Sequence, residues 1–146
     1  LILVAHSKSM TAALSRLFRE RQVEKRYRAV VAGDFSKQPD PLRVESPVDE
    51  KDAVSHFSMV EVSANRSRSM VDVHIETGRK HQIRRHLAET GYPIIGDRLY
   101  GSGVADGVDL QLTAWLLAFH CPVADRRVEY RLEGEWLPAP GTYSAP

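Results

Sequence analysis

The stretch ETGRKHQIRRHLAETGYPIIGDRLYG, from Glu76 to Gly101, carries the densest pattern in this chain of 146 residues. Six basic or histidine residues fall within eight positions, and a glycine-rich turn with an aromatic residue follows. With Thr77 as its cap, the pattern predicts a helix from about Arg79 to Glu89 that stops at Gly91. The first helical turn then holds three basic residues, Arg79, Lys80 and His81.

Basic side chains at the start of a helix oppose the helix macrodipole, which is already positive there, at a cost of roughly 0.3–1 kcal/mol each. A sequence that breaks a local rule three times in succession usually does so for function. Unpaired backbone N–H groups and basic side chains together form a good phosphate site, so we expect an anion to dock here. The alternative is a solvated charged face with Glu76 and Glu89 as counter-charges.

Arg84 differs from its basic neighbours because it lies at the buried edge of the predicted helix. Ile83 and Leu87, four residues apart, mark that edge. An arginine in this position can bury its stem and bind a carboxylate through two hydrogen bonds. The sequence leaves the identity of that carboxylate open.

Composition indicates one globular domain without a membrane-spanning segment. The chain is 42% apolar and 27% charged, and no apolar run approaches the roughly 20 residues that span a bilayer. Cys121 is the only cysteine, which excludes an intrachain disulfide and fits a reducing cytoplasm. The net charge of +1 hides two segments, Arg16–Arg28 and Arg66–His86, each with six basic against two acidic residues. If these segments meet in space, they form a phosphate-binding face.

Hydrophobic periodicity predicts an α+β fold with a mainly antiparallel mixed sheet and flanking helices. A helix is expected from Ser7 or Ser9 to about Gln22, and a proline-rich loop, with room for a short edge strand, over 34–52. Strands are expected over 1–5, 25–33, 53–64, 68–78, 110–121 and 126–134, the third and fourth forming a hairpin that turns near Asn65. We expect a single domain over 1–146, with 138–146 as a loose tail.

Three stretches resemble the RluA-type pseudouridine synthases. The opening stretch resembles their TGR-x-HQIR-x-H segment followed by G-x-PI-x-GD-x-x-YG, with the same spacing. VEKRYRAVVAG, residues 23–33, resembles the K-x-Y-x-A-x-V-x-G strand, and LQLTAWLLAFHCPV, residues 110–123, resembles a later L-x-L-H-A strand. Thr113 departs from the family, which has histidine there. The resemblance covers nearly the whole chain and implies the pseudouridine synthase catalytic-domain fold.

The resemblance implies isomerisation of uridine to pseudouridine in structured RNA, either ribosomal or transfer RNA. Tyr27 resembles the tyrosine that stacks on the target uracil and is proposed to assist proton removal, although an isolated strand tyrosine would more simply be a core residue. Arg84 resembles the arginine that pairs with the catalytic aspartate, and Ile83 resembles the apolar residue of the uridine pocket. The remaining residues expected to contact RNA are Arg79, Lys80, His81, Gln82 and Arg85. No metal, organic cofactor, membrane or DNA is implied, and we expect a cytoplasmic monomer.

The nucleophilic aspartate of this family lies in an H-R-L-D-x-x-T-S-G-L segment directly before an apolar strand like LILVA, residues 1–5. We therefore expect it shortly before Leu1, and expect the 146-residue chain alone to be inactive. Neither Asp72 nor Asp97 has motif support as a replacement. The alternative function is a truncated relative that binds RNA without modifying it.

Two other chemistries have weaker support. His56, His74, His81 and His86 could in principle bind a metal, but no HxxxH pair exists, and the last two lie on different helix faces. Cys121 has His120 as its nearest histidine, and adjacent strand residues point to opposite faces. Neither pattern predicts a site.

Overall fold

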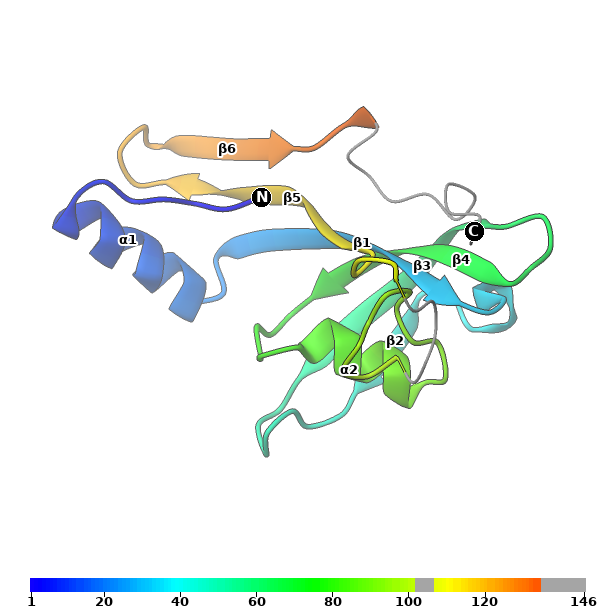
Figure 1. Ribbon diagram of the computed structural model, residues 1–146. Helices are drawn as coiled ribbons and strands as arrows, with labels where there is room; N and C mark the ends of the chain where they lie inside the picture. Colours follow the sequence, from blue (N-terminus) through cyan, green and yellow to red (C-terminus); the bar gives the residue numbers. More distant parts are fainter. Residues whose placement is uncertain (102–106, 135–146) are drawn as a thin grey trace.

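The structure, a computed structural model, describes residues 1–101 and 107–134 (Figure 1). It contains a six-stranded sheet in the order β2-β3-β4-β1-β5-β6, in which every neighbouring pair is antiparallel. The elements along the chain are α1 (Lys8–Arg19), β1 (Val23–Ala32), the 3-10 helix η1 (Phe35–Lys37), β2 (Leu42–Glu45), β3 (Val54–Val62), β4 (Arg68–Ile75), α2 (Gln82–Glu89), β5 (Leu112–Cys121) and β6 (Arg126–Arg131). The predicted α+β class is confirmed.

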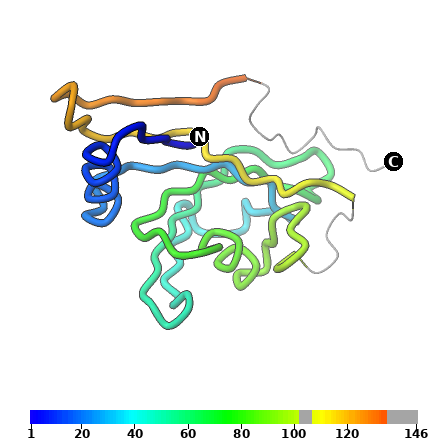
Figure 2. Tube along the Cα trace, turned by 60° about the vertical axis from the view of Figure 1, so that its left-hand side comes forward, coloured from blue at the N-terminus to red at the C-terminus, as the bar shows by residue number. Residues whose placement is uncertain are grey.

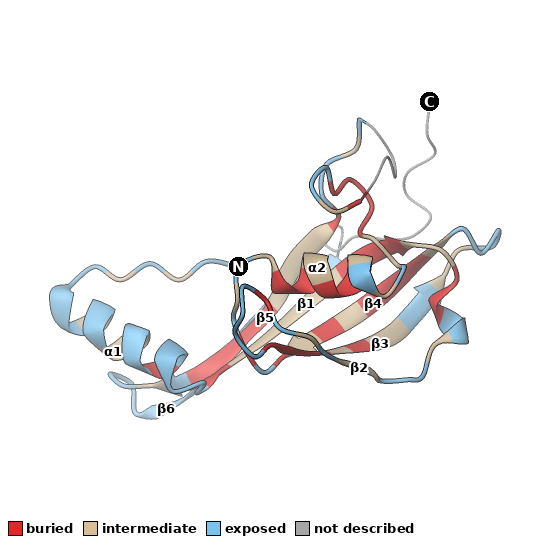
Figure 3. Ribbon diagram, turned by 90° about the horizontal axis from the view of Figure 1, so that it is seen from below, coloured by how far each residue is buried: buried red, intermediate tan, exposed pale blue. Residues whose placement is uncertain are grey.

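Strand β1 is the central element, since it pairs with β4 on one side and with β5 on the other. One face of the sheet is apolar and packs against α2, which contributes Ile83 and Leu87 to the main core (Figure 3). The strand residues of this core are buried aliphatic and aromatic side chains, among them Ala29, Val31, Phe57, Val71 and Val73. Because alternate residues of β1 face α2, Tyr27 lies on the same side of the sheet as this core.

Helix α1 packs at the far end of the sheet, over β5 and β6. Leu17 of α1 forms a second, smaller core with Val23, Leu117 and Phe119. The helix begins after Ser7, whose hydroxyl accepts a hydrogen bond from the Met10 amide, as one of the two predicted caps requires. It ends three residues before the predicted Gln22. Neither described helix is long and apolar enough to cross a membrane.

The predicted strand over residues 1–5 is wrong. Ile2 and Val4 are 90% and 69% exposed, and the segment forms no ladder with the described sheet. Figures 1 and 2 both show it running beside β5, where the Leu1 nitrogen donates to the Ala114 carbonyl. Strand β5 pairs with β1 along most of its length and with β6 over Leu116–Cys121, so beyond its first residues it offers no free edge to a further strand.

The predicted start of the second helix is also wrong. Helix α2 begins at Gln82, so Arg79, Lys80 and His81 form a turn before it instead of its first turn. His81 holds the N-cap position in a left-handed conformation, with φ of 56° and no side-chain cap hydrogen bond. Thr77 does not cap the helix, because its hydroxyl donates to the Gln82 side chain. The predicted end at Gly91, which has φ of 84°, agrees with the structure. The predicted tail, 138–146, lies outside the described residues.

Candidate active site

A cleft of about 480 Å³ opens between β1, α2 and the turn that joins β4 to α2. Six of the eight predicted site residues line it: Tyr27, Arg79, His81, Gln82, Ile83 and Arg84. Its apolar wall is completed by Phe18, Ile75, Leu110 and Leu112. The other two predicted residues lie outside: Lys80 is exposed, and Arg85 donates to Asp49 at 2.7 Å.

Tyr27 enters the cleft from β1, next to a bulge in the pairing of β1 with β5. The bulge lies between Arg26 and Tyr27, opposite Trp115. Burial raises the pKa of the Tyr27 phenol above its ordinary value of 10.0. At neutral pH the phenol is therefore protonated, so its ring can pack on a base and its hydroxyl can donate a hydrogen bond.

Arg84 binds the carboxylate of Asp97 through two parallel hydrogen bonds. Its Nε donates to Oδ2 at 2.8 Å and its Nη2 donates to Oδ1 at 2.6 Å. The Asp97 side chain is only 1% exposed and that of Arg84 is 15% exposed. Burial acts to raise the pKa of Asp97, but the hydrogen bonds from Arg84 and from two backbone amides outweigh it and leave the pKa below its usual value. The same pairing raises the pKa of Arg84.

The turn that carries Asp97 explains the glycine spacing of the GDRLYG motif. Gly96 has φ of 77°, and a Cβ there would lie 2.3 Å from the carbonyl oxygen of Asp109. A Cβ at Gly101 would lie 2.3 Å from the Asp97 carbonyl oxygen, which accepts the Gly101 amide hydrogen bond. Only glycine fits these two close backbone approaches. Together they fix the loop that presents the Asp97 carboxylate.

Tyr100 joins this loop to the turn before α2. The guanidinium carbon of Arg84 lies 5.1 Å from the centre of the Tyr100 ring, a cation–π contact. The Tyr100 hydroxyl is hydrogen-bonded to Nδ1 of His81 at 3.2 Å. Arg84 is thus held by a carboxylate on one side and by an aromatic face on the other.

Gln82 is buried beneath the cleft, and its side-chain amide bonds in both directions. It donates to the Val54 carbonyl and to the Ser55 hydroxyl, at 3.0 and 2.9 Å. It accepts from the Thr77 hydroxyl and from the Arg79 amide, at 2.7 and 3.0 Å. These bonds clamp the 77–82 turn onto β3, and so determine where Arg79 and His81 lie.

The four histidines considered as metal ligands have separate surroundings. His86 is fully buried, and its Nε2–H donates to the Ser46 carbonyl while Nδ1 bonds the Ser55 hydroxyl. His56 bonds Glu76 at 2.7 Å and stacks on His74 at a ring distance of 5.9 Å. Within residues 1–101 and 107–134, no three His, Cys, Asp or Glu side chains are grouped so that they could hold a metal ion.

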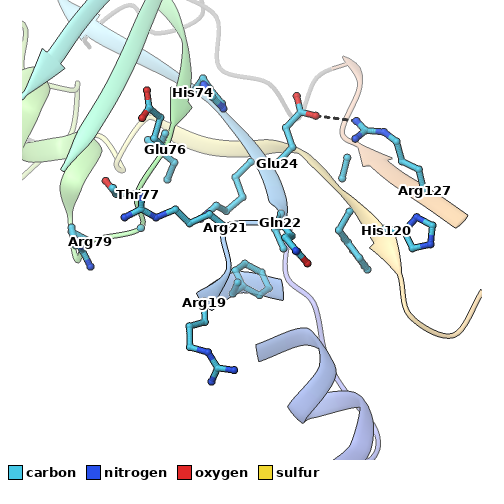
Figure 4. A pocket seen from close by; sticks show the side chains of 17 residues that line it. Arg19, Arg21, Gln22, Glu24, His74, Glu76, Thr77, Arg79, His120 and Arg127 are labelled. Atoms are coloured by element: carbon cyan, nitrogen blue, oxygen red, sulfur yellow. Dashed lines mark hydrogen bonds and ion pairs between the residues drawn. The ribbon is translucent and has the colours of Figure 1, made fainter. Parts of the chain in front are cut away.

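The two basic segments of the sequence meet in a larger hollow of about 960 Å³ beside the cleft (Figure 4). Arg19 is the last residue of α1, Arg21 lies in the turn after it, Lys25 comes from β1, and Arg79 comes from the turn before α2. The hollow and the cleft share five lining residues, which are Phe18, Lys25, Ile75, Gly78 and Arg79. Both acids of the hollow are paired: Glu24 bonds Arg127, which also lines the hollow, and Glu76 bonds His56.

The antiparallel sheet, the basic hollow and the cleft lined by Tyr27, Ile83 and Arg84 agree with the enzyme family that the sequence motifs resemble. The family model for RNA pseudouridylate synthase matches residues 1–89. The chain therefore belongs to the RNA pseudouridylate synthase family, and the resemblance to its RluA-type members is confirmed.

Relatives agree across most of the chain. An RNA pseudouridine synthase of Mycobacterium bovis is 35% identical over 149 residues, which cover 88% of this chain and 46% of the relative. Ribosomal large subunit pseudouridine synthase D of Zymomonas mobilis is 30% identical over a match that covers 91% of this chain and 48% of the relative. The chain thus spans about half the length of these curated relatives.

Solved structures agree at the level of the fold. The human RNA pseudouridylate synthase domain containing 1 superposes with a TM-score of 0.77 at 24% identity, covering 94% of this chain and 65% of its own. The human domain containing 4 gives a TM-score of 0.70 at 22% identity, covering 90% and 64%.

Sequence reasoning missed two residues of the site. Asp97 is the buried carboxylate that Arg84 binds, and its place in the same motif, three residues after Ile94, was the available signal. Lys25 lines the cleft as well, and its place in the K-x-Y pattern, two residues before Tyr27, was the available signal.

Proposed function

We propose that the full protein isomerises uridine to pseudouridine in structured RNA, either ribosomal or transfer RNA. One observation carries this proposal: Tyr27, Ile83 and Arg84, which the family pattern assigns to the site, come from a strand and a helix far apart in sequence and line a single cleft. The family membership of the chain supports the same reaction.

The reaction breaks the N1–C1′ glycosidic bond and forms a C5–C1′ bond, so the C5 proton leaves and N1 gains a proton. The uridine must leave its stack for a protein group to reach these atoms. In the cleft, the Tyr27 ring packs on the uracil and Ile83 forms the apolar wall. Since the phenol is protonated, Tyr27 acts by packing and by donating a hydrogen bond while the base turns.

The nucleophile is not Asp97, because this carboxylate is buried and accepts hydrogen bonds from Arg84, Leu99 and Tyr100. Asp72 is engaged as well, by Trp115 at 2.7 Å and by Arg26. We place the nucleophilic aspartate in a segment of the full protein before Leu1, as the family pattern implies. Leu1 lines a small hollow together with Tyr27, which supports this placement. The 146-residue chain alone should therefore be inactive.

Arg84 orients the incoming aspartate. Asp97 occupies Nε and one N–H of Nη2, and among the described residues nothing accepts from Nη1. An ordinary aspartate is already ionised at pH 7, so the contribution of Arg84 is to fix its direction. Gln82 supports the site from below, through its clamp on the 77–82 turn.

The basic residues Arg79, Lys80, His81 and Arg85 contact the RNA around the target. We expect no cofactor and no DNA substrate, and we expect the protein to act as a monomer in the cytoplasm. The basic hollow next to the cleft is where the strand that flanks the flipped nucleotide would lie.

The test is to map pseudouridine in total RNA from a strain that lacks the gene, with and without the full-length protein added back. Conversion at one or a few uridines supports the proposal and identifies the substrate. No conversion, with the upstream aspartate present, contradicts it. RNA binding without conversion would favour the alternative, a relative that binds RNA without modifying it.

A further inference from the structure

The ammonium group of Lys25 lies where three hollows of the surface meet. Lys25 lines the cleft with Tyr27, the basic hollow with Arg79, and the small hollow next to Leu1. Its position two residues before Tyr27 on β1 places both side chains on the same side of the sheet. Among the described residues, Phe18 is the only other one that lines all three hollows.

This ammonium group has no anionic partner in the described part of the chain. It lies over the Phe18 ring, 5.6 Å from Nζ to the ring centre. The adjacent Arg26, by contrast, contacts both Glu24 and Asp72. Burial lowers the pKa of Lys25 below 10.5, with no carboxylate to oppose it. Partly burying a cation without an anionic partner costs free energy, and the needs of folding alone do not explain why a lysine stands here.

Gly78 makes room for this group. A Cβ added at Gly78 would lie 3.3 Å from Nζ of Lys25, closer than side chains normally approach. The glycine of the TGR segment therefore leaves space for the Lys25 ammonium where the cleft joins the basic hollow. Arg79, the next residue, lines both spaces.

We propose that Lys25, with Arg79 beside it, binds the backbone phosphate of the nucleotide whose base packs on Tyr27. The inference rests on the proposed function, because it requires an RNA strand in the cleft. Two residues along a strand lie about 6.5 Å apart and point to the same side, so Lys25 and Tyr27 can contact neighbouring parts of one nucleotide. A compact ammonium charge suits a single phosphate oxygen. Lys25 thus fixes the register of the strand.

The experiment compares full-length wild type, Lys25→Gln, Lys25→Arg and the control Lys37→Gln, which removes an exposed lysine from η1. The probe is a short fluorescein-labelled oligouridylate, titrated at several salt concentrations, together with the same oligomer carrying uncharged methylphosphonate linkages. We expect Lys25→Gln to weaken binding of the charged probe about tenfold and to reduce the slope of log Kd against log salt by about 0.7. The effect should vanish with the uncharged probe, and Lys25→Arg should restore the slope.

An unchanged slope for Lys25→Gln, or the same loss with both probes, would overturn the inference. So would reduced turnover with an unchanged Kd, which would assign Lys25 to the reacting aspartate. The melting temperature of Lys25→Gln should equal or exceed that of wild type, and a fall would indicate a structural role. If the wild-type protein binds RNA but converts no uridine, the proposed function fails, while the comparison of the Lys25 variants still tests the phosphate contact. Absence of binding would defeat both.

Discussion

The guanidinium of Arg84 has a structural role and, in the proposed function, a second one. Its Nε and Nη2 hold the buried carboxylate of Asp97, and the proposed function assigns Nη1 to the incoming aspartate. Replacing Arg84 alone should therefore disturb the fold as well as the proposed chemistry, since Asp97 would stay buried without its partner.

At this scale we predict that Arg84→Met lowers the free energy of unfolding by about 3–5 kcal/mol, because it strands a buried charge. The double variant Arg84→Met/Asp97→Asn should recover much of this loss, since the asparagine is neutral and can still accept from the Leu99 and Tyr100 amides. Urea denaturation of both variants measures the effect. Equal stability of the single and double variants would show that the pair is not coupled.

The depressed pKa of Asp97 predicts a loss of stability in acid. Its contribution is fully present above the ordinary aspartate pKa of about 3.9, and it is lost as the pH falls through the lower folded value. Between pH 5 and pH 2, the free energy of unfolding should therefore fall more steeply with decreasing pH for wild type than for Asp97→Asn. Parallel pH profiles for the two proteins would refute this prediction.

At the scale of elements, the strands could be predicted and two boundaries could not. Alternation of apolar and polar residues, with a polar turn near Asn65 between them, located β3 and β4, but it did not predict the shift of their register between Met59 and Glu61. Residues 1–5 are equally apolar, but whether they form a strand depends on a free sheet edge, which the local pattern does not contain. The start of α2 depended on Gln82 reaching Thr77 and Val54, a tertiary contact that no capping rule includes.

Gly96 and Gly91 form a matched pair for testing the loop that carries Asp97. Both have positive φ, but a Cβ at Gly91 meets nothing within 4 Å, whereas one at Gly96 meets the Asp109 backbone. We predict that Gly91→Ala costs about 1–2 kcal/mol, the cost of the left-handed conformation alone. Gly96→Ala should cost at least about 1–3 kcal/mol more, because backbone must move. Thermal and urea unfolding test this, and equal costs would contradict the close approach.

At the scale of the whole molecule, the near-zero net charge conceals a basic surface. The sequence marked the two basic segments, but only the sheet order, with β1 central and α1 at its end, brings Arg19 and Arg21 to Arg79 (Figure 4). The position of a residue in the cleft could be predicted where a motif marked it, as for Tyr27, Ile83 and Arg84. The meeting of the two basic segments could not, because no motif links them.

We predict that Arg19→Gln/Arg21→Gln reduces the salt slope of RNA binding by about 1.4, the value for two phosphate contacts on a single strand. The control Lys37→Gln/Lys51→Gln removes the same charge from exposed positions outside the hollow and should leave the slope unchanged. Fluorescence anisotropy over a salt series measures both. Equal slopes for the two double variants would mean that the hollow does not contact RNA.

The central claim is that this cleft converts uridine to pseudouridine, and release of tritium from RNA labelled at uridine C5 measures it most directly, because the reaction expels the C5 hydrogen. The full-length protein should release tritium from its target RNA. The variant Arg84→Met/Asp97→Asn should bind the same RNA with similar affinity but release tritium about 100-fold more slowly or not at all. Release by this variant at the wild-type rate, or no release by a wild-type protein that binds the RNA, would contradict the account.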